Sequence, residues 1–478
     1  MIADLNRASD WTHVNVCVAG IRLAGAACAR ATKELGAQVT AVDAGESPDH
    51  QRWASALRSD DISVVLGDSG SLPTDTDLLI VSPGFPPTAP IILAAQERGI
   101  PVWGELELAW RLRGPDPAPW LVITGTNGKT TATLMLAAML QAAGHRAIAA
   151  ANIGVSLVDA VLHQDLDVIA VEVGAPQLPF WHTVAPLGAA VLNLAEDHVD
   201  HFGSYQNYVA AKGRIYDRCT GAAVFNCADP QTRILVDAAA LGADCRRIGF
   251  TLDVPEPGEF GVVEQYLIDR TFTPDPAREA LEVAELSDVH PYAPHNVANA
   301  LAAAALARTY GIDPDHIRAG LQQFEPAGHR ISEVGVVDEV RYVDDSKATN
   351  AHAALTALAA YDSVVWIAGG LAKGQSYDDL VQQMAHKIRA VVLLGADQDV
   401  IAEALQRHAP QIPLVAVSRT DTMAMAEVVA AAARLAQPRD TVLLAPGCAS
   451  WDMYRSYAER GDIFAQEVAK LHGPDQTH

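Results

Sequence analysis

Residues 121–131 constrain the fold of this chain more than any other segment. They read LVITGTNGKTT, so an apolar run ends abruptly in a glycine-containing turn and a Lys-Thr pair follows. A long apolar-periodic segment comes next, which predicts a strand, a loop and a helix in immediate succession. Backbone N–H groups of such a loop and helix start point at anionic oxygens, and the helix dipole favours negative charge there. The segment therefore predicts a nucleotide phosphate site and a chain that uses ATP.

The phosphate loop is a short variant of the common pattern. The position five residues before the Gly-Lys pair is Ile123, still inside the predicted strand, where the usual pattern has glycine. Lys129 is expected to reach the outer phosphates, and the Thr130 hydroxyl is expected to hold a magnesium ion. An ordinary strand-to-helix turn is the alternative, but the apolar segments on both sides favour a phosphate site. The residues expected to bind ATP here are Gly125, Thr126, Asn127, Gly128, Lys129, Thr130 and Thr131.

Composition limits the classes of function. The chain has 478 residues and a formal net charge of −24, from 34 basic and 58 acidic residues, without a long basic run. That balance argues against a nucleic-acid partner.

The six cysteines show neither metal-ligand nor redox spacing, which indicates reduced thiols in a reducing compartment. Because the N-terminus lacks a signal pattern and no apolar run could span a bilayer, we expect a cytoplasmic protein without a transmembrane segment.

The order of apolar runs predicts an α/β fold of three domains. Residues 1–113 alternate strand and helix patterns, which favours a Rossmann-like domain. The proline-rich stretch 114–119 reads as a linker into a central ATP-binding domain with a mostly parallel sheet, residues 114–326. Residues 327–478 predict a second Rossmann-like domain. Strands are expected at 14–20, 38–43, 77–83, 167–173, 189–194, 222–226, 363–370, 390–395 and 441–447, and helices at 23–35 and 296–310.

A weak dinucleotide fingerprint lies near the N-terminus. Residues 19–25 read AGIRLAG, and Asp43 ends the next predicted strand, about where a ribose-binding carboxylate lies in such folds. A Rossmann-like domain that binds no ligand is the alternative interpretation.

Three further residues could complete a metal–phosphate site in the central domain. Glu172 ends an apolar strand, where a carboxylate near a phosphate loop is a natural magnesium ligand. His198 follows another parallel strand of the same domain. Lys212 lies in a helical segment, and from its spacing alone it is expected on the helix surface.

With these residues in view, the chain resembles the Mur ligase family over essentially its whole length. The markers are residues 124–131, Asn152-Ile153-Gly154, Glu172, residues 196–198, 210–216, 295–299, 328–330, 344–350 and 445–450. The segment Asp-Ser-Lys-Ala-Thr-Asn at 345–350 is similar to that of the family member that adds D-glutamate to UDP-N-acetylmuramoyl-L-alanine.

The resemblance implies an ATP-dependent amide ligase of peptidoglycan precursor synthesis that forms an acyl phosphate. It implies two Mg²⁺ ions: one on Thr130 and Glu172, and a second on His198 and a carbamylated Lys212. Carbamylation turns the lysine cation into a carboxylate, which suits a divalent cation beside a triphosphate. The expected partners are UDP-N-acetylmuramoyl-L-alanine, D-glutamate and ATP, and we expect a monomer.

The resemblance also implies roles for residues outside the phosphate loop. The catalytic residues would be Lys129, His198, Lys212 and Lys347. Further ATP contacts would come from Asn296, Asn299, Arg330 and Asp345. The UDP-sugar would bind Gly20, Leu23, Ala24, Asp43, Ser82, Gly84, Asn152 and Gln177, and D-glutamate would bind Lys347, Thr349, Lys373, Ser450 and Tyr457.

Two departures from the family pattern, and three other functions, stay open at this point. After Glu172 the family usually shows Ser-Ser-Phe-Gln, where this chain has residues 174–177 reading GAPQ, and residues 44–45 after Asp43 are Ala-Gly rather than polar. The alternatives are another amide ligase such as folylpolyglutamate synthetase, a regulatory nucleotide-binding ATPase, and a dinucleotide-dependent oxidoreductase. Folylpolyglutamate synthetase lacks a separate N-terminal nucleotide-binding domain, so the presence of residues 1–113 argues against it. An oxidoreductase would not explain the phosphate loop that contains Lys129.

Overall fold

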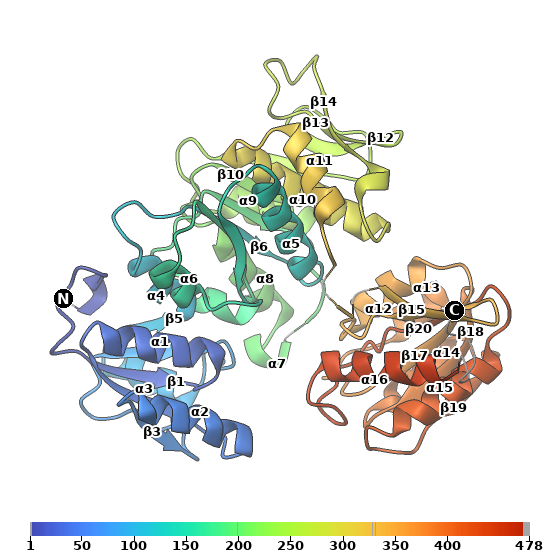
Figure 1. Ribbon diagram of the computed structural model, residues 1–478, viewed down its shortest axis with the longest axis horizontal. Coiled ribbons are helices and arrows are strands. Elements are labelled where there is room, and N and C mark those ends of the chain that lie inside the picture. Colours follow the sequence, from blue (N-terminus) through green and yellow to red (C-terminus); the bar gives the residue numbers. More distant parts are fainter. Residues whose placement is uncertain (1, 198, 327, 330, 472–478) are drawn as a thin grey trace. The chain divides into compact units, whose positions relative to one another are not determined.

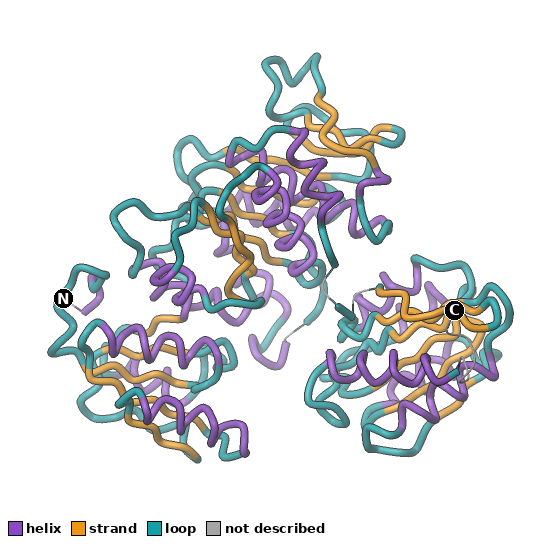
Figure 2. The backbone as a smooth tube through the Cα atoms, viewed as in Figure 1, coloured by secondary structure: helices purple, strands orange, loops and turns teal. Residues whose placement is uncertain are grey.

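A computed structural model describes residues 2–197, 199–326, 328–329 and 331–471. The chain forms two compact units that divide between Phe324 and Glu325, with residues 195–197 and 293–295 counted in the second unit. Three sheets with helices on their faces are present, two in the first unit and one in the second (Figures 1 and 2). The predicted three-domain α/β architecture with mostly parallel sheets is therefore confirmed.

The N-terminal sheet is wholly parallel and has the order β3-β2-β1-β4-β5. Its strands are β1 (Asn15–Ala19), β2 (Gln38–Asp43), β3 (Ser63–Leu66), β4 (Leu78–Val81) and β5 (Val102–Gly104), and its helices are α1 (Leu23–Glu34), α2 (Pro48–Ser59), α3 (Pro90–Glu97) and α4 (Glu105–Arg111), after a 3-10 turn η1 (Ile2–Asp4). Since strand order reverses between β1 and β4, a ligand is expected at their carboxyl ends.

The central sheet has nine strands in the order β14-β13-β12-β11-β10-β9-β6-β8-β7. The strands from β7 to β12 are parallel, and the β12-β13-β14 edge is antiparallel. The strands are β6 (Trp120–Thr124), β7 (Ala147–Ala151), β8 (Val168–Glu172), β9 (Gly188–Val191), β10 (Ala222–Asn226), β11 (Arg246–Phe250), β12 (Glu259–Val263), β13 (Tyr266–Asp269) and β14 (Leu281–Glu285). The helices are α5 (Lys129–Ala142), α6 (Leu157–His163), η2 (Ala175–Phe180), α7 (Val199–Phe202), α8 (Tyr205–Gly213), η3 (Arg214–Tyr216), α9 (Pro230–Ala238), η4 (Leu286–Asp288), α10 (Pro294–Tyr310) and α11 (Pro314–Gln323).

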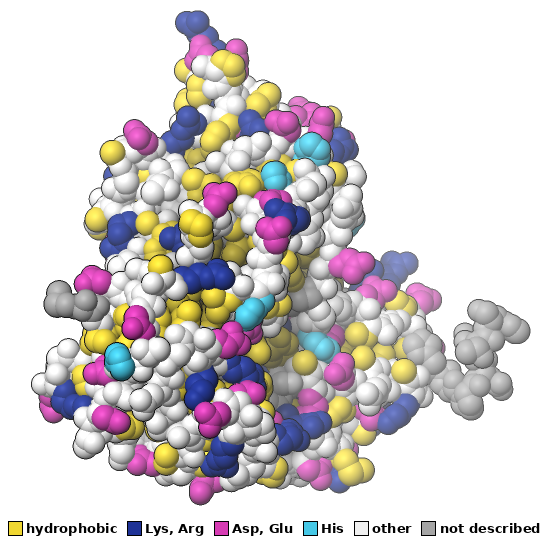
Figure 3. Space-filling view, turned by 60° about the vertical axis from the view of Figure 1, so that its left-hand side comes forward, with side chains coloured by type: hydrophobic (Ala, Val, Ile, Leu, Met, Phe, Trp, Pro, Cys, Tyr) yellow, Lys and Arg dark blue, Asp and Glu magenta, His cyan; other side chains and the backbone are white. Residues whose placement is uncertain are grey.

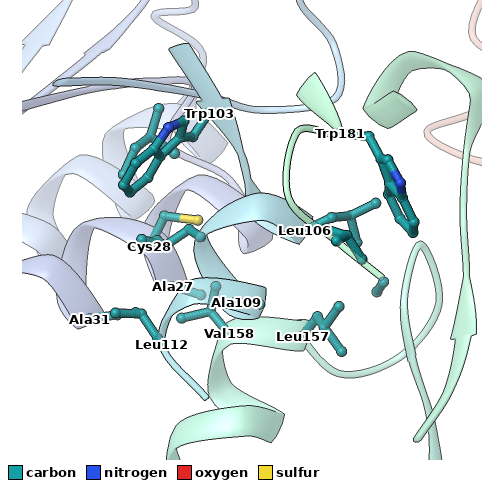
Figure 4. Close-up of a cluster of buried hydrophobic side chains, with 14 of the residues drawn as sticks. Ala27, Cys28, Ala31, Trp103, Leu106, Ala109, Leu112, Leu157, Val158 and Trp181 are labelled. Carbon is teal, nitrogen blue, oxygen red and sulfur yellow. The ribbon is translucent and has the colours of Figure 1, made fainter. Parts of the chain in front are cut away.

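The N-terminal and central sheets of the first unit share one hydrophobic core. Trp103 and Leu106 from β5 and α4 belong to the same buried cluster as Leu157 and Val158 of α6 and as Trp181 (Figure 4). A continuous apolar core opposes relative movement, because separating the two domains would expose large buried side chains to water. The helices α5, α10 and α11 belong to a second buried cluster on the other side of the central sheet.

The C-terminal sheet has the order β15-β16-β20-β17-β18-β19 and is parallel except for the β15-β16 pair. Side chains alternate along β17, so that Trp366 joins one core cluster while Val365 and Ile367 join the other. The strands are β15 (Ser332–Val337), β16 (Val340–Asp344), β17 (Val364–Gly369), β18 (Ile388–Leu394), β19 (Leu414–Ala416) and β20 (Thr441–Leu444). The helices are α12 (Ala351–Ala359), α13 (Asp378–Met384), α14 (Gln398–His408), α15 (Ala424–Leu435) and α16 (Tyr457–Lys470).

The surface of the described residues carries charged side chains of both signs, as the composition predicts. Basic and acidic side chains are interspersed over the face shown in Figure 3. Within the described ranges, no helix combines the length and the apolar character that crossing a bilayer requires.

Candidate active site

The phosphate loop connects the end of β6 to the start of α5, as the sequence predicts. Gly128 precedes the helix with φ of +82°, in the left-handed region that glycine adopts without penalty. A Cβ at this position would lie 2.4 Å from the side-chain Oδ1 of Asn299 on α10. Two separate features therefore require glycine at this position: its left-handed backbone conformation and the close approach of the Asn299 side chain.

Two residues that the sequence analysis did not select brace this loop. Asn193, which follows β9, accepts a hydrogen bond from the Asn127 N–H with its Oδ1 (2.8 Å) and donates to the Asn127 carbonyl with its Nδ2 (3.1 Å). Tyr208 of α8 shares a buried 2.8 Å hydrogen bond with the Thr126 hydroxyl. Neighbouring elements thus hold the loop in shape before any phosphate binds, which lowers the ordering cost of binding.

Lys129 lies folded over its own loop. Its Nζ donates hydrogen bonds to the carbonyl oxygens of Gly125 (2.8 Å) and Thr126 (2.9 Å). Thr130 and Thr131 follow in the first turn of α5 and are buried. The lysine cation and the helix N-terminus therefore lie together at the point where a triphosphate is expected.

Glu172 has the chemistry that a magnesium ligand needs. Its side chain is 2 % exposed at the carboxyl end of β8, directly beside β6. One carboxylate oxygen accepts a 2.6 Å hydrogen bond from the Asn152 amide, and the other is buried and has no partner among the described residues. A buried carboxylate oxygen without a donor is costly unless a cation binds it. In the described part of the chain, no group of three or more His, Cys, Asp or Glu side chains is arranged to hold a metal ion, but the Glu172 carboxylate and the Thr130 hydroxyl are oxygen ligands of the kind that suits a hard cation.

Lys212 is buried, contrary to the helix-surface position expected from spacing alone. Its side chain is 1 % exposed, and Nζ donates to the Gly125 carbonyl (2.8 Å) and to the Thr124 hydroxyl (3.2 Å). The amine also lies 4.9 Å from the centre of the Tyr208 ring. Helix α8 turns this side chain inward because it packs against the η2 segment and the loop after β6, a long-range arrangement that periodicity cannot reveal.

The N-terminal candidate site lies at the carboxyl ends of β1, β2 and β4. The Asp43 carboxylate accepts hydrogen bonds from the N–H groups of Ile21 (3.1 Å) and Gly45 (2.8 Å), so it shapes the loop that the sequence analysis proposed for a nucleotide. Gly20 has φ of +92°, and a Cβ there would lie 2.6 Å from the Ser82 hydroxyl. Leu23 and Gly84 are exposed beside this turn, and Ala24 is half-buried in the first turn of α1.

Asn152 and Gln177 both lie close to Gly174, just after the Glu172 strand end: a Cβ at Gly174 would lie 3.4 Å from the side-chain oxygen of each. Gln177 is buried, and its side-chain oxygen accepts a 2.8 Å bond from the Gly174 N–H. The departure at residues 174–176 thus forms the start of the η2 turn, with Pro176 in its first positions. Glu105, a residue not selected from sequence, accepts bonds from the Ser156 hydroxyl and the Leu157 N–H (2.8 Å each) and so anchors the turn after Asn152 to the N-terminal domain.

The residues expected beside adenine are brought close to the phosphate loop. Asn296 and Asn299 are buried one turn apart on α10. The Asn299 amide lies 3.4 Å from the Asn296 side-chain oxygen, and Asn296 also donates to the Pro291 carbonyl (2.9 Å). Two predicted site residues, His198 and Arg330, lie outside the described residues.

The C-terminal unit brings three loops together at the carboxyl ends of β16, β17 and β20. Leu371 and Ala449 exchange backbone hydrogen bonds (2.9 and 3.0 Å), and the Gly447 N–H donates to the Ala348 carbonyl (2.8 Å). These bonds join the segments that carry the predicted D-glutamate residues Lys347, Thr349, Lys373 and Ser450. Asp345, predicted to contact ATP, is buried in the first of these loops.

Both predicted D-glutamate lysines lie over aromatic rings. The Lys347 Nζ is 3.9 Å from the centre of the Tyr457 ring, and the Lys373 Nζ is 4.6 Å from that of Trp451. Trp451 is 68 % exposed and directly follows Ser450. Two cations held at defined positions by aromatic faces are suited to a dicarboxylate ligand.

Arg460 of α16 ties two of these loops together, and sequence reasoning missed it. Its guanidinium is 1 % exposed and donates to the Ser346 hydroxyl (2.9 Å), the Ser346 carbonyl (2.8 Å) and the Cys448 carbonyl (3.2 Å). Burial lowers the pKa of Arg460 to about 10, so it remains a cation at neutral pH. Nothing in its local sequence distinguishes it from a surface arginine of an amphipathic helix.

Comparison with known families covers all three domains. Residues 14–104 match the MurD-like N-terminal domain of Mur ligases, residues 123–307 match the Mur ligase middle domain, and residues 329–448 match the Mur ligase glutamate ligase domain.

Individual proteins extend the similarity to nearly the full length. The chain is 53 % identical to a Streptomyces avermitilis protein named UDP-N-acetylmuramoylalanine--D-glutamate ligase, over 97 % of this chain and 99 % of that protein. It is 41 % identical to the Mycolicibacterium smegmatis protein of the same name, over 95 % and 96 %. Among solved structures, UDP-N-acetylmuramate-alanine ligase MurC from Thermotoga maritima matches with a TM-score of 0.58 at 18 % identity, covering 96 % of this chain and 99 % of that chain, and so shares the fold.

Proposed function

This chain belongs to the Mur ligase family, and we propose that it is the member that joins D-glutamate to UDP-N-acetylmuramoyl-L-alanine with ATP. The observation that carries the proposal is its 53 % identity, over nearly the full length, to a relative of that name. In the proposed reaction, the substrate carboxylate attacks the γ-phosphate of ATP to give an acyl phosphate and ADP. The amine of D-glutamate then attacks the acyl carbon, and inorganic phosphate leaves.

The arrangement of the first unit supports the phosphoryl-transfer half of this reaction. Lys129 and the N-terminus of α5 would neutralise the phosphates, while Asn296 and Asn299 would border adenine. Glu172 and the Thr130 hydroxyl would hold one magnesium ion, and His198 with a modified Lys212 would hold a second; such ions supply charge neutralisation at the transferred phosphate. The loop around Gly20, Asp43 and Ser82, together with Asn152 and Gln177, would hold the UDP-sugar.

The second unit supports the choice of amino acid. Lys347, Thr349, Lys373, Ser450 and Tyr457 would hold D-glutamate, because two cations and two hydroxyls suit its two carboxylates. Neither a regulatory ATPase nor a dinucleotide-dependent oxidoreductase would need this group of residues.

The proposed activity predicts a strict dependence on the acceptor. With ATP, magnesium and UDP-N-acetylmuramoyl-L-alanine, phosphate release is expected with D-glutamate, and release with L-glutamate, D-aspartate or no amino acid is expected to be lower by at least about 100-fold. A coupled phosphate assay measures this directly. Equal release with another amino acid would move the chain to a different ligase of the family, and release that no acceptor stimulates would favour the regulatory ATPase.

We further propose that Lys212 is carbamylated in the active enzyme. The modification joins the neutral amine to carbon dioxide, forming an N–C bond and releasing one proton, and the Lys212 side chain is only 1 % exposed to solvent. Its position beside the Gly125 carbonyl would place the new carboxylate at the phosphate loop.

Replacement of this lysine tests the modification. The Lys212→Ala variant is expected to lose activity on the order of 100-fold, and short carboxylic acids such as acetate are expected to restore part of it, whereas bicarbonate is not. The matched control is Lys33→Ala, which removes a surface lysine paired with Asp61 and should leave activity unchanged. Full activity of Lys212→Ala would refute the carbamate.

A further inference from the structure

A cavity of about 380 Å³ lies beside the linker that joins the N-terminal and central domains of the first unit. Its walls come from Arg7 ahead of β1, from the linker at residues 113–118 with Trp120 of β6, and from residues 160–166 at the end of α6. None of the residues proposed above for ATP, the UDP-sugar or metal lines it. Its volume is within the range of small-molecule sites.

The cavity wall holds a partly buried cation without a counter-ion. The Arg113 guanidinium lies 3.0 Å from the centre of the Trp110 ring, and its Nε donates to the Trp110 carbonyl (2.9 Å). Within the described residues, Arg113 forms no ion pair, and burial lowers its pKa to about 10, which leaves it charged at neutral pH. The aromatic rings and the carbonyl that contact Arg113 carry no net negative charge, so an anion bound here would offset the desolvation of the guanidinium.

A second arginine adds donors to the same wall, and a buried indole lies behind it. Arg7 is exposed at the cavity, and its Nη1 lies 3.8 Å from where a Cβ of Gly114 would be. No acceptor for the Arg7 guanidinium occurs in the described part of the chain. Trp120 is fully buried, its ring centre is 5.9 Å from the Arg113 guanidinium, and its Nε1 likewise has no acceptor there. The two guanidinium groups are therefore the charged donors of this wall, and Trp120 packs behind it.

The acidic residues of the cavity do not cancel this charge. Asp165 is already paired with Arg146. Asp116, in the exposed linker, is the remaining carboxylate of the lining and forms no ion pair with either cavity arginine in the described residues. Besides Asp165, the lining therefore contains two arginines, Arg7 and Arg113, and one carboxylate, that of Asp116, which forms no ion pair with them in the described part of the chain.

From this arrangement we propose that the cavity is a binding site for a small organic anion, in which a carboxylate or phosphate group pairs with Arg113 and Arg7. A flat apolar part of the same molecule would pack on Val161, Leu162 and Leu166, which are the partly exposed apolar residues of the lining. This site is separate from the substrates of the proposed ligase reaction, so it can bind its ligand while they are bound.

Calorimetric titration of the full chain, saturated with ADP and UDP to fill the nucleotide sites, tests the proposal. The probes are phenyl phosphate, benzoate, inorganic phosphate and benzyl alcohol. Phenyl phosphate or benzoate is expected to bind at one site with a millimolar or lower Kd, and whichever binds more tightly identifies the preferred anionic group. Inorganic phosphate and benzyl alcohol are each expected to bind at least about tenfold more weakly, because each lacks half of the recognition.

Variants connect the binding to this cavity. Arg113→Gln and Arg7→Gln are each expected to weaken phenyl phosphate binding by about tenfold, and Asp116→Asn is expected to tighten it. The control is Arg278→Gln, which removes an arginine whose side chain is 86 % exposed elsewhere in the first unit and should change nothing. Arg7 is exposed, so its variant tests the site even if Arg113→Gln fails to fold. Absence of saturable binding at about 10 mM probe, equal binding of benzyl alcohol, or equal affinity in all variants would overturn the proposal.

Discussion

Replacing Glu172 with glutamine is expected to lower kcat on the order of 10³-fold while the protein stays folded. Glutamine keeps the shape of the side chain and can still accept the hydrogen bond from Asn152. It removes the negative charge, however, and places an amide group where the buried, unpartnered oxygen of Glu172 now lies. The loss would therefore fall on the cation site rather than on packing.

The measurements that separate these two effects are kcat as a function of magnesium concentration and the thermal unfolding midpoint. The midpoint is expected to stay unchanged or to rise, because an uncompensated buried carboxylate is removed. A useful control is Glu107→Gln: this equally buried carboxylate accepts hydrogen bonds from His182, Thr183 and Arg111, so its loss should lower the midpoint and leave the magnesium response alone. Retention of more than about one-tenth of the activity by Glu172→Gln would contradict the assignment.

Replacing Arg460 with methionine is expected to destabilise the C-terminal unit by about 3–5 kcal/mol and to raise the KM for D-glutamate by at least about tenfold. The change leaves the carbonyl groups of Ser346 and Cys448 without their buried donor, and each unpaired acceptor costs about 1–3 kcal/mol. The loops that carry Lys347 and Ser450 would then lose their shared anchor. Arg460→Lys should be intermediate, since one amine cannot replace the fork of the guanidinium.

A neighbouring arginine provides the matched control for this prediction. Arg455 is 90 % exposed just before the same helix and, among the described residues, forms an ion pair with Glu459 alone, so Arg455→Met is expected to change stability by less than about 1 kcal/mol. Calorimetric unfolding of the full chain and separate KM values for D-glutamate and ATP distinguish the two positions. Similar effects of both replacements would show that Arg460 is not an anchor of the amino-acid loops.

Much of the fold could be predicted because its central strands are continuous apolar runs. The expected strands at 38–43 and 222–226 coincide with the parallel strands β2 and β10, whose apolar residues are buried although Gln38 is exposed. The antiparallel edge β12–β14 was not foreseen, since its strands have only four or five residues each, which is too short for a clear periodic pattern. The phosphate loop was also predictable, because its conformation depends on adjacent residues such as Gly128 and Lys129.

The parts of the site that depend on distant residues could not be read from local pattern. Lys212 looks like a surface lysine until α8 places it against Thr124, 88 positions away. Arg460 donates a hydrogen bond to Ser346, which is 114 positions away in the sequence, and the periodicity of α16 does not predict that contact.

The strand–loop–helix order around residues 120–142, the mostly parallel sheets and the family could all be inferred from the chain alone, because apolar periodicity and sequence motifs are local properties. Which charged groups are withdrawn from water depends instead on how distant elements pack. Burial of Glu172, Lys212 and Arg460 arises when separate elements pack together, and that packing, rather than residue type, turns ordinary charged side chains into parts of a site.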